Sequence, residues 1–224
     1  MHTTVTNILA PLETRIRERH LLRHPFYQAW SAGALSRQAL REYSKQYYHQ
    51  VEAFPTYVSA VHSNCPSFSV RQQLLENLIE EERGDDNHPE LWLRFAEALG
   101  VSRVEVVTAP LLPETVATVQ TFRTLTRDRS YLAGLAALFA YEAQVPEVAA
   151  AKIAGLKQFY GIEDPRAVAF FTVHQQIDRW HAETARQVLG ANLNGDNTAE
   201  VVTACEQALE ALWKLLDGVY HAYC

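Results

Sequence analysis

The sequence predicts an all-α fold, and three features of the chain support this class. Apolar residues recur at spacings of three and four almost throughout, which is the period of an amphipathic helix. Runs that alternate apolar and polar residues, as a half-buried strand does, are few. Capping and helix-breaking residues divide the chain into segments of helical length. We therefore expect a bundle of about seven to nine helices.

Capping signals place the ends of the helices in the first half of the chain. Ser36 is a typical N-cap, and Asn87 followed three residues later by Glu90 resembles a capping box. Gly84 indicates that the helix before it has ended, and Pro89 favours the start of a new one. The expected helices of this half cover residues 4–21, 25–32, 36–63, 67–83 and 88–99.

In the second half, breakers and polar runs separate longer helices. The longest irregular stretch lies near residues 100–112, and the polar run at 192–197 is an evident loop. Pro146 kinks or divides the helix in which it stands. The expected helices of this half cover residues 113–128, 131–158, 165–190 and 197–222.

Composition and organisation favour a single domain over residues 1–224. Hydrophobic residues make up 48% and charged residues 21% of the chain, values typical of a globular protein. Neither a repeat nor a flexible linker divides the sequence. The net charge of −6 argues against the basic surface that nucleic acid binding requires, so we expect no nucleic acid partner. A homodimer would be ordinary for such a bundle.

The cysteines and the hydropathy pattern predict a cytoplasmic protein. Cys65, Cys205 and Cys224 are odd in number, far apart and outside any C-x-x-C motif, which suggests neither a disulfide framework nor a thiolate metal site. No stretch approaches the roughly 18 continuous apolar residues of a membrane span. We therefore expect no membrane association.

The sharpest chemical signal lies in the helix expected at 165–190. His174, Asp178 and His181 are spaced by four and then three residues, so they fall on one stripe of the helix. Apolar residues continue the same stripe, which is therefore expected to face the core, and buried polar groups need partners. Imidazole with carboxylate is a common ligand mix for a divalent transition metal. The alternative is an exposed helix face with two ordinary histidines.

A second candidate ligand ends an uncharged helical run. No charged residue occurs from Tyr131 through Tyr141, and Glu142 follows directly. A helix that is apolar all round is buried. Glu142 is therefore either the solvent-exposed end of this helix or an inward carboxylate that meets His174 and His181, and we favour the inward ligand.

The third contributor is the segment that contains Glu81 and His88. The two residues are seven apart, but the break between them removes the argument that they share one helix face. An acidic helix end followed by a turn and a histidine would point both groups inwards from adjoining helices. Taken alone, the acidic residues from Glu80 to Asp86 are also explained as a solvated charge run.

Together the three segments supply three carboxylates and three imidazoles. Such a set suits two metal ions with open positions for oxygen, and it favours iron or manganese over a structural zinc site. The candidate metal ligands are Glu81, His88, Glu142, His174, Asp178 and His181.

These residues resemble, in order and spacing, the ligand set of the heme-oxygenase-like di-metal oxidases, and within them the CADD-like proteins. That family pairs a Glu and a His seven apart, adds one Glu on a later helix, and ends with H-x-x-x-D-x-x-H. The resemblance covers nearly the full chain and implies a TenA/PqqC-like helical bundle. It also implies a centre of two irons, or of manganese and iron, with dioxygen and an external reductant as co-substrates.

The resemblance further implies synthesis of 4-aminobenzoate, a folate precursor, from the protein's own side chains. Tyr27 would supply the ring, Lys152 would give the amino nitrogen, and Tyr141 would relay an electron or radical near the metals. The local sequence leaves two alternatives open. Tyr27 is also explained as a member of an aromatic core cluster, and Lys152 as a surface lysine whose stem is buried.

The chain departs from the family at Phe170, where the Chlamydia protein has a further tyrosine, and phenylalanine cannot form a phenoxyl radical. Tyr43, Tyr47, Tyr48 and Tyr57 are candidates to substitute, or they serve packing alone. Three other functions stay open: a di-metal oxidase acting on a free small molecule, a metal-free enzyme like the thiaminase and pyrroloquinoline-quinone synthase relatives, and a helical interaction module.

Overall fold

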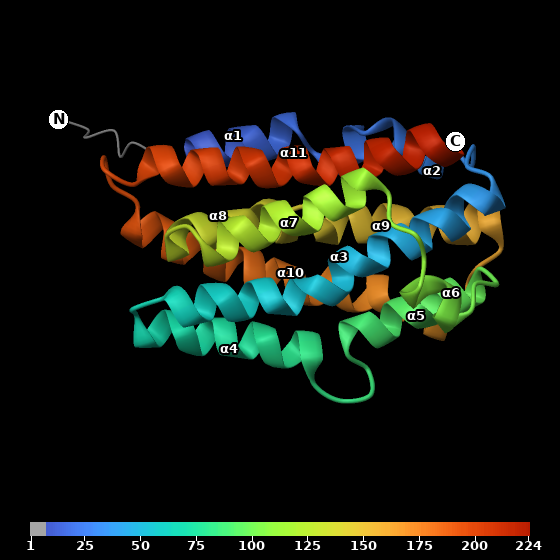
Figure 1. The fold of residues 1–224 in the computed structure, drawn as a ribbon, viewed down its shortest axis with the longest axis horizontal. Helices are drawn as coiled ribbons and strands as arrows, with labels where there is room; N and C mark the ends of the chain where they lie inside the picture. Colours follow the sequence, from blue (N-terminus) through green and yellow to red (C-terminus); the bar gives the residue numbers. More distant parts are fainter. Residues whose placement is uncertain (1–7) are drawn as a thin grey trace.

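The computed structural model describes residues 8–224 and contains helices but no strand within that range. Long helices run side by side along the longest axis of the molecule (Figure 1). The α-helices are α1 (Ala10–Glu18), α2 (Pro25–Ser31), α3 (Arg37–Asn64), α4 (Phe68–Glu82), α5 (His88–Ala98), α6 (Arg103–Val107), α7 (Pro113–Arg127), α8 (Tyr131–Glu142), α9 (Val145–Gly155), α10 (Pro165–Asn192) and α11 (Thr198–Tyr223). The predicted all-α class is confirmed.

The core forms where α8 is enclosed by its neighbours. Helix α8 packs against α11, α10, α7 and α3, and all its residues from Leu132 to Glu142 are buried, as an uncharged helix requires. Helix α3 packs on α4, α5 and α7, while α10 packs on α5, α8 and α9. The helices that carry the candidate ligands therefore surround a common interior.

Several predicted helix ends are confirmed by hydrogen bonds. The Ser36 hydroxyl accepts from the Ala39 amide at 3.0 Å, and the Asn87 side chain accepts from the Glu90 amide at 3.0 Å. The complete capping box lies elsewhere, at Ser102 and Glu105, where it starts α6. The stretch near 100–112 was expected to be irregular, so the short α6 within it corrects that prediction.

Two predicted helices are shorter or divided. In place of the helix expected over 4–21, α1 covers Ala10–Glu18 and a separate 3-10 turn follows at Leu21–Arg23, while residues 4–7 lie outside the described part. The helix expected over 131–158 is divided into α8 and α9 just before Pro146, which stands in the first turn of α9, where proline is tolerated. A π-helical turn (Leu156–Tyr160) follows α9.

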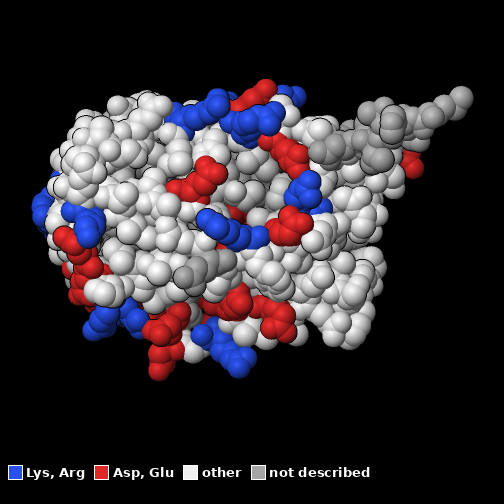
Figure 2. All heavy atoms as spheres, turned by 180° about the vertical axis from the view of Figure 1, so that it is seen from behind, with Lys and Arg blue, Asp and Glu red and all other residues white. Residues whose placement is uncertain are grey.

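The surface carries charges of both signs. On the face in Figure 2, lysine and arginine side chains alternate with aspartate and glutamate, without a continuous basic stripe. Exposed ion pairs such as Arg15 with Glu206 and Arg19 with Glu210 follow this pattern. Within residues 8–224, no helix is both long and apolar enough to cross a membrane. The expectation that nucleic acid is not a partner stays a prediction.

Candidate active site

The six predicted metal ligands come from four helices and lie in the interior. Glu81 stands one residue before the end of α4, His88 is the first residue of α5, and Glu142 is the last residue of α8. The other three share α10. Each of the six is 4% exposed or less, so the exposed alternatives for α10 and for Glu142 do not hold. The residues brought together are Glu81, His88, Glu142, His174, Asp178 and His181.

Glu81, His88 and His174 form one cluster with the spacing of metal ligands. Each offers a ligand atom within 4.8 Å of the other two. The Nδ1 atom of His174 lies 2.6 Å from the Phe170 carbonyl oxygen, one helical turn earlier. Because a carbonyl only accepts, Nδ1 carries the hydrogen and Nε2 is left as the ligand nitrogen. Burial also lowers the pKa of His174 well below its ordinary value, which keeps the ring neutral.

Glu142, Asp178 and His181 form a second group beside the first. His181 Nδ1 lies 3.7 Å from Glu142 Oε1 and 3.7 Å from Asp178 Oδ1. The amide of Asn77 donates a 2.8 Å hydrogen bond to Glu142 Oε1. Burial raises the pKa of Glu142 to about 8 and raises that of Asp178 as well. Both carboxylates therefore need nearby positive charge to stay ionised.

Several buried polar atoms in these groups make no hydrogen bond, which tests whether the residues fit metal ions. His88 Nδ1 approaches Glu81 Oε2 to 2.6 Å without hydrogen-bond alignment, so proximity alone does not satisfy it. Asp178 Oδ2 and both ring nitrogens of His181 are likewise unsatisfied. Buried groups of this kind cost free energy unless they are paired, and divalent cations would pair them. The nitrogen and oxygen donors fit iron or manganese.

Sequence reasoning missed two residues that contact the candidate ligands. Asn77 lies one helical turn before Glu81 on the buried stripe of α4, a spacing that could have revealed it. Glu80 places Oε2 2.8 Å from His181 Nε2, although the pair is not aligned as a hydrogen bond. Glu80 belongs to the acidic run that was also explained as solvated, and its side chain is 38% exposed. No local signal separates it from its neighbours.

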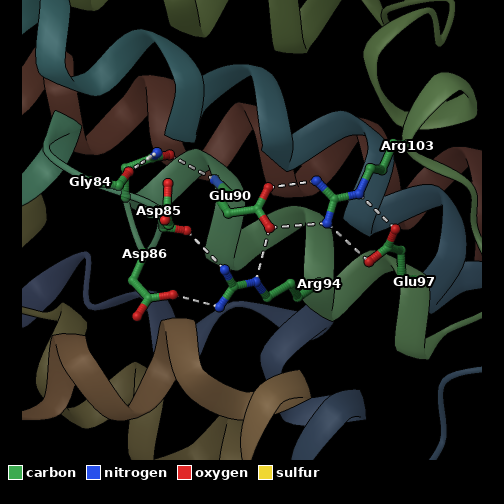
Figure 3. A network of polar contacts seen from close by, with 8 residues as sticks. Gly84, Asp85, Asp86, Glu90, Arg94, Glu97 and Arg103 are labelled. Atoms are coloured by element: carbon green, nitrogen blue, oxygen red, sulfur yellow. Dashed lines mark hydrogen bonds and ion pairs between the residues drawn. The ribbon is translucent and has the colours of Figure 1, made fainter.

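The loop between Glu81 and His88 is held by arginines of the following helices (Figure 3). Arg94 donates to the Asp86 carboxylate at 2.7 Å, to the Asp85 carbonyl at 2.8 Å and to Glu90 at 2.9 Å. Arg103 in turn bridges Glu90 and Glu97. The exposed part of the acidic run thus fixes how α4 meets α5, and with it how the two candidate ligands meet.

Lys152 lies in a buried aromatic chamber that also holds Tyr27. Its Nζ donates a 2.7 Å hydrogen bond to Tyr43 Oη, which lies 3.0 Å from Tyr27 Oη. Nζ is 5.2 Å from the centroid of the Tyr27 ring. Burial lowers the pKa of Lys152 well below its ordinary value, which favours the neutral amine. The surface alternative for Lys152 does not hold, and Tyr27 is both a core aromatic and a neighbour of the amine.

Two small inner cavities lie beside Lys152 and beside the candidate ligands. One is lined by Lys152 and Tyr47, the other by Glu81 and Asp178. The side chains that line both are Tyr141, Phe170 and His174. Tyr141 therefore lies between Lys152 and the candidate ligands, and its role as a relay stays a prediction.

The tyrosines proposed as substitutes at Phe170 divide into two groups. Tyr47 donates a 3.0 Å hydrogen bond to Tyr141 Oη, and Tyr43 contacts Lys152. Tyr57 instead donates to Gln50, and Tyr48 packs edge-on to His49. The Phe170 ring packs 4.1 Å from the His174 ring, centroid to centroid, and offers no hydroxyl there.

Comparison with known proteins identifies the family. The profile described as "Iron-containing redox enzyme" matches residues 41–213. The 4-aminobenzoate synthase of Nitrosomonas europaea is 46% identical, covering 95% of this chain and 91% of that protein. The 4-aminobenzoate synthase of Chlamydia pneumoniae is 40% identical, covering 96% and 95%. This chain belongs to the CADD-like iron-containing redox enzymes.

Solved structures agree with the fold of this CADD-like enzyme. A TenA homologue from Pseudomonas syringae superposes with a TM-score of 0.81 at 19% identity, covering 96% of this chain and 91% of that one. A CADD-like protein from Nostoc punctiforme gives 0.75 at 17% identity, covering 95% and 98%. The predicted heme-oxygenase-like, TenA/PqqC-like bundle is confirmed, and so is the prediction of an oxidoreductase.

Proposed function

We propose that this CADD-like enzyme makes 4-aminobenzoate from its own Tyr27 side chain, with Lys152 as the amino donor. The names of the Nitrosomonas and Chlamydia relatives support the product. The observation that carries the mechanism is the buried amine of Lys152, hydrogen-bonded to Tyr43 and next to Tyr27. If Tyr27 and Lys152 served only to fill the core, a buried amine beside the Tyr27 ring would not be needed.

The Tyr27 side chain already holds most of the product's skeleton. It has a benzene ring with oxygen at one end and Cβ at the other, and Cβ would become the carboxyl carbon. This conversion breaks the Cα–Cβ bond of Tyr27 and the Cε–Nζ bond of Lys152 and oxidises Cβ to a carboxyl group. The Lys152 nitrogen replaces the ring oxygen, which leaves as water. A bound metal pair, with dioxygen and an external reductant, would supply the oxidising power that side chains lack.

The chain's own residues would prepare that reaction in two ways. Burial keeps water from Tyr27 and Lys152, which are 1% and 3% exposed, and holds the amine in its neutral, nucleophilic form. Tyr43 would fix the position of Nζ through its hydroxyl. Proximity of amine and ring removes the entropic cost of bringing two reactants together.

Six residues would hold the metals. Glu81, His88 and His174 would bind one ion, because their ligand atoms already lie together. Glu142, Asp178 and His181 would bind a second, which would satisfy their unpaired buried atoms. Two irons, or manganese with iron, suit this donor set.

Tyr141 would carry an electron between the metals and the chamber. It lines the cavity beside Glu81 and Asp178, and its hydroxyl accepts from Tyr47. The Tyr47 ring lies 5.2 Å from the Tyr43 ring, and Tyr43 contacts Tyr27. This row of rings offers a route that does not need a hydroxyl at Phe170.

The test is to load the purified protein with iron and manganese, add reductant and dioxygen, and quantify 4-aminobenzoate by mass spectrometry. We expect product, together with mass changes in the peptides that contain Tyr27 and Lys152. Tyr27→Phe and Lys152→Arg should each abolish product. Tyr57→Phe is the matched control, because this buried tyrosine bonds to Gln50 outside the chamber.

Two outcomes would contradict the proposal. Unchanged masses of both peptides in protein that consumes oxygen without making 4-aminobenzoate would indicate a di-metal oxidase acting on a free small molecule. Full product from Tyr27→Phe would exclude Tyr27 as the source of the ring. A genetic version asks whether the gene rescues a cell that requires 4-aminobenzoate, and whether Tyr27→Phe loses the rescue.

A further inference from the structure

A cavity between α4, α8 and α10 extends from the surface to the candidate metal ligands. Its outer end is lined by Gln73, which is exposed, and by Trp180, which is 49% exposed. Its inner end is lined by Asn77, Glu142 and His181, all buried. Between the two ends, the half-buried Thr184 adds one hydroxyl to a wall that is otherwise apolar and comprises Val70, Leu74, Leu135, Leu138, Ala185 and Val188.

The packing of α4 explains why the bundle opens here. Helix α4 lies at the edge of the molecule and is held mainly by α3 (Figure 1). Its contacts with α10 are sparse. The apolar side chains of α4 therefore meet those of α8 and α10 across an incompletely filled space.

Two other cavities are lined by candidate ligands, and they differ from this one in the exposure of their lining residues. Every residue that lines them is buried, both around Glu81 and Asp178 and around Lys152. Among these three cavities, the one beneath Trp180 alone has exposed lining residues. Among these three cavities, it is therefore the one whose lining connects exposed residues with candidate ligands.

The apolar side chains of the wall favour the entry of small apolar molecules over water, ions and polar molecules. A buried water needs two to four polar partners, and between its two ends this wall offers one side-chain hydroxyl, that of Thr184. Ions and polar reductants would lose their hydration there without compensation. A small apolar molecule loses nothing, as the binding of xenon in apolar protein cavities illustrates. At the inner end, His181 presents ring nitrogens that make no hydrogen bond.

We propose that this passage, defined by the six apolar wall residues, admits dioxygen to the metal centre. The proposal rests on the oxygen dependence of the proposed function and adds its route of entry. Product and reductant would not share the route, because both are larger and more polar than its walls accommodate. Leu74 and Leu135, which face the passage from α4 and α8, would set its width.

Xenon tests the passage independently of any reaction. Crystals of the metal-free protein pressurised with xenon should show a xenon atom between Leu74, Leu135 and Val188. Leu74→Ala should raise its occupancy, and Leu74→Phe should abolish it. Xenon bound only elsewhere, or unaffected by Leu74→Phe, would overturn the proposal even if the enzyme makes 4-aminobenzoate.

Oxygen kinetics test the role of the passage. The reduced, metal-loaded protein is mixed rapidly with buffers of several dioxygen concentrations, and the second-order rate constant of its oxidation is measured. Leu74→Phe should lower this constant several-fold at unchanged metal content. The control is Leu209→Phe, the same change at a buried leucine that lines a different cavity, between α1, α7 and α11.

The two measurements separate the possible failures. Equal rate constants for Leu74→Phe and Leu209→Phe would overturn the passage while leaving the proposed function intact. If the wild-type protein did not consume dioxygen at all, the proposed function would fail, and a dioxygen route would fail with it. Xenon in the passage together with a slowed reaction in Leu74→Phe alone is the result we expect.

Discussion

At the scale of single residues, the chamber around Lys152 depends on one hydroxyl. Tyr43 accepts a hydrogen bond from Nζ and pairs with Tyr27, so it connects the proposed donor of nitrogen with the proposed donor of the ring. Aromatic rings surround the rest of the amine, including Phe171 at 5.1 Å. Their faces attract a cation only weakly relative to water, so burial still favours the neutral amine.

Tyr43→Phe should therefore impair the reaction far more than the fold. Losing one hydroxyl costs about 1 kcal/mol of stability, whereas a misplaced amine should lower the yield of 4-aminobenzoate by about tenfold or more. Product yield, melting temperature and metal content are measured on the same preparation. Full yield from Tyr43→Phe would show that this hydroxyl does not position Lys152.

At the scale of elements, the connection from α4 to α5 brings two candidate ligands together across a break. Glu81 ends one helix and His88 begins the next, and Arg94 holds the intervening loop through Asp85 and Asp86. Asn87 adds a 2.8 Å hydrogen bond from its side-chain amide to the Gly84 carbonyl. The angle between the helices is thus fixed by residues that do not themselves face the interior.

Arg94 contacts neither ligand directly, so Arg94→Gln should loosen this connection and weaken metal binding by up to about tenfold, the lower end of the loss found when direct partners of metal ligands are removed. Isothermal titration with Mn²⁺ measures the affinity. Arg41→Gln is the matched control, because Arg41 also donates to a loop carbonyl, that of Gly100, but away from the ligands. Both variants should lose about 1 kcal/mol of stability, and equal Mn²⁺ affinities would contradict the assigned role of Arg94.

At the scale of the whole molecule, the bundle buries ionisable groups that its own charges do not balance. Burial is the main reason why the pKa values of Glu142 and Asp178 are raised. Lys152, whose pKa is lowered by the same cause, hydrogen-bonds to a tyrosine instead of a carboxylate. Metal ions would therefore contribute to the stability of the whole fold, because they bind the native arrangement and not the unfolded chain.

The contribution of Glu142 to the stability of the metal-free protein should fall as the pH rises. The pKa of Glu142 is about 8 in the folded protein, against 4.5 for an ordinary glutamate in the unfolded chain. Folding therefore favours the protonated form. This contribution is fully present below about pH 4.5 and is lost as the pH rises through about 8. Thermal melts should show a smaller decline for Glu142→Gln than for the wild type.

Melting temperatures measured with added metal test the same group from its ionised side. Added Mn²⁺ should raise the melting temperature of the wild type most at the alkaline end, where the carboxylates are ionised, and should raise that of Glu142→Gln less. Comparison with Glu142→Gln isolates this group, because Lys152 titrates in both proteins. Identical pH profiles for the two proteins would show that Glu142 is not buried as the structure has it.

Local sequence was enough to predict most of the helices and which residues share a helix face. The helical period placed His174, Asp178 and His181 on one stripe, and Pro146 and Gly84 fixed where helices end, because these effects act within a few residues of chain. The sequence also supplied the family, whose membership the comparisons confirm. The roles of the six candidate ligands stay predictions.

Which helix faces meet depends on packing in three dimensions and could not be predicted from local sequence. Lys152 reaches Tyr43 and Glu80 reaches His181 across more than one hundred residues of chain, and local spacing carries no information about either contact. The passage beneath Trp180 likewise exists only because α4 packs loosely on α10. How helices rotate and pack against one another depends on the fit of side chains that are distant in sequence, and that fit is absent from any one segment.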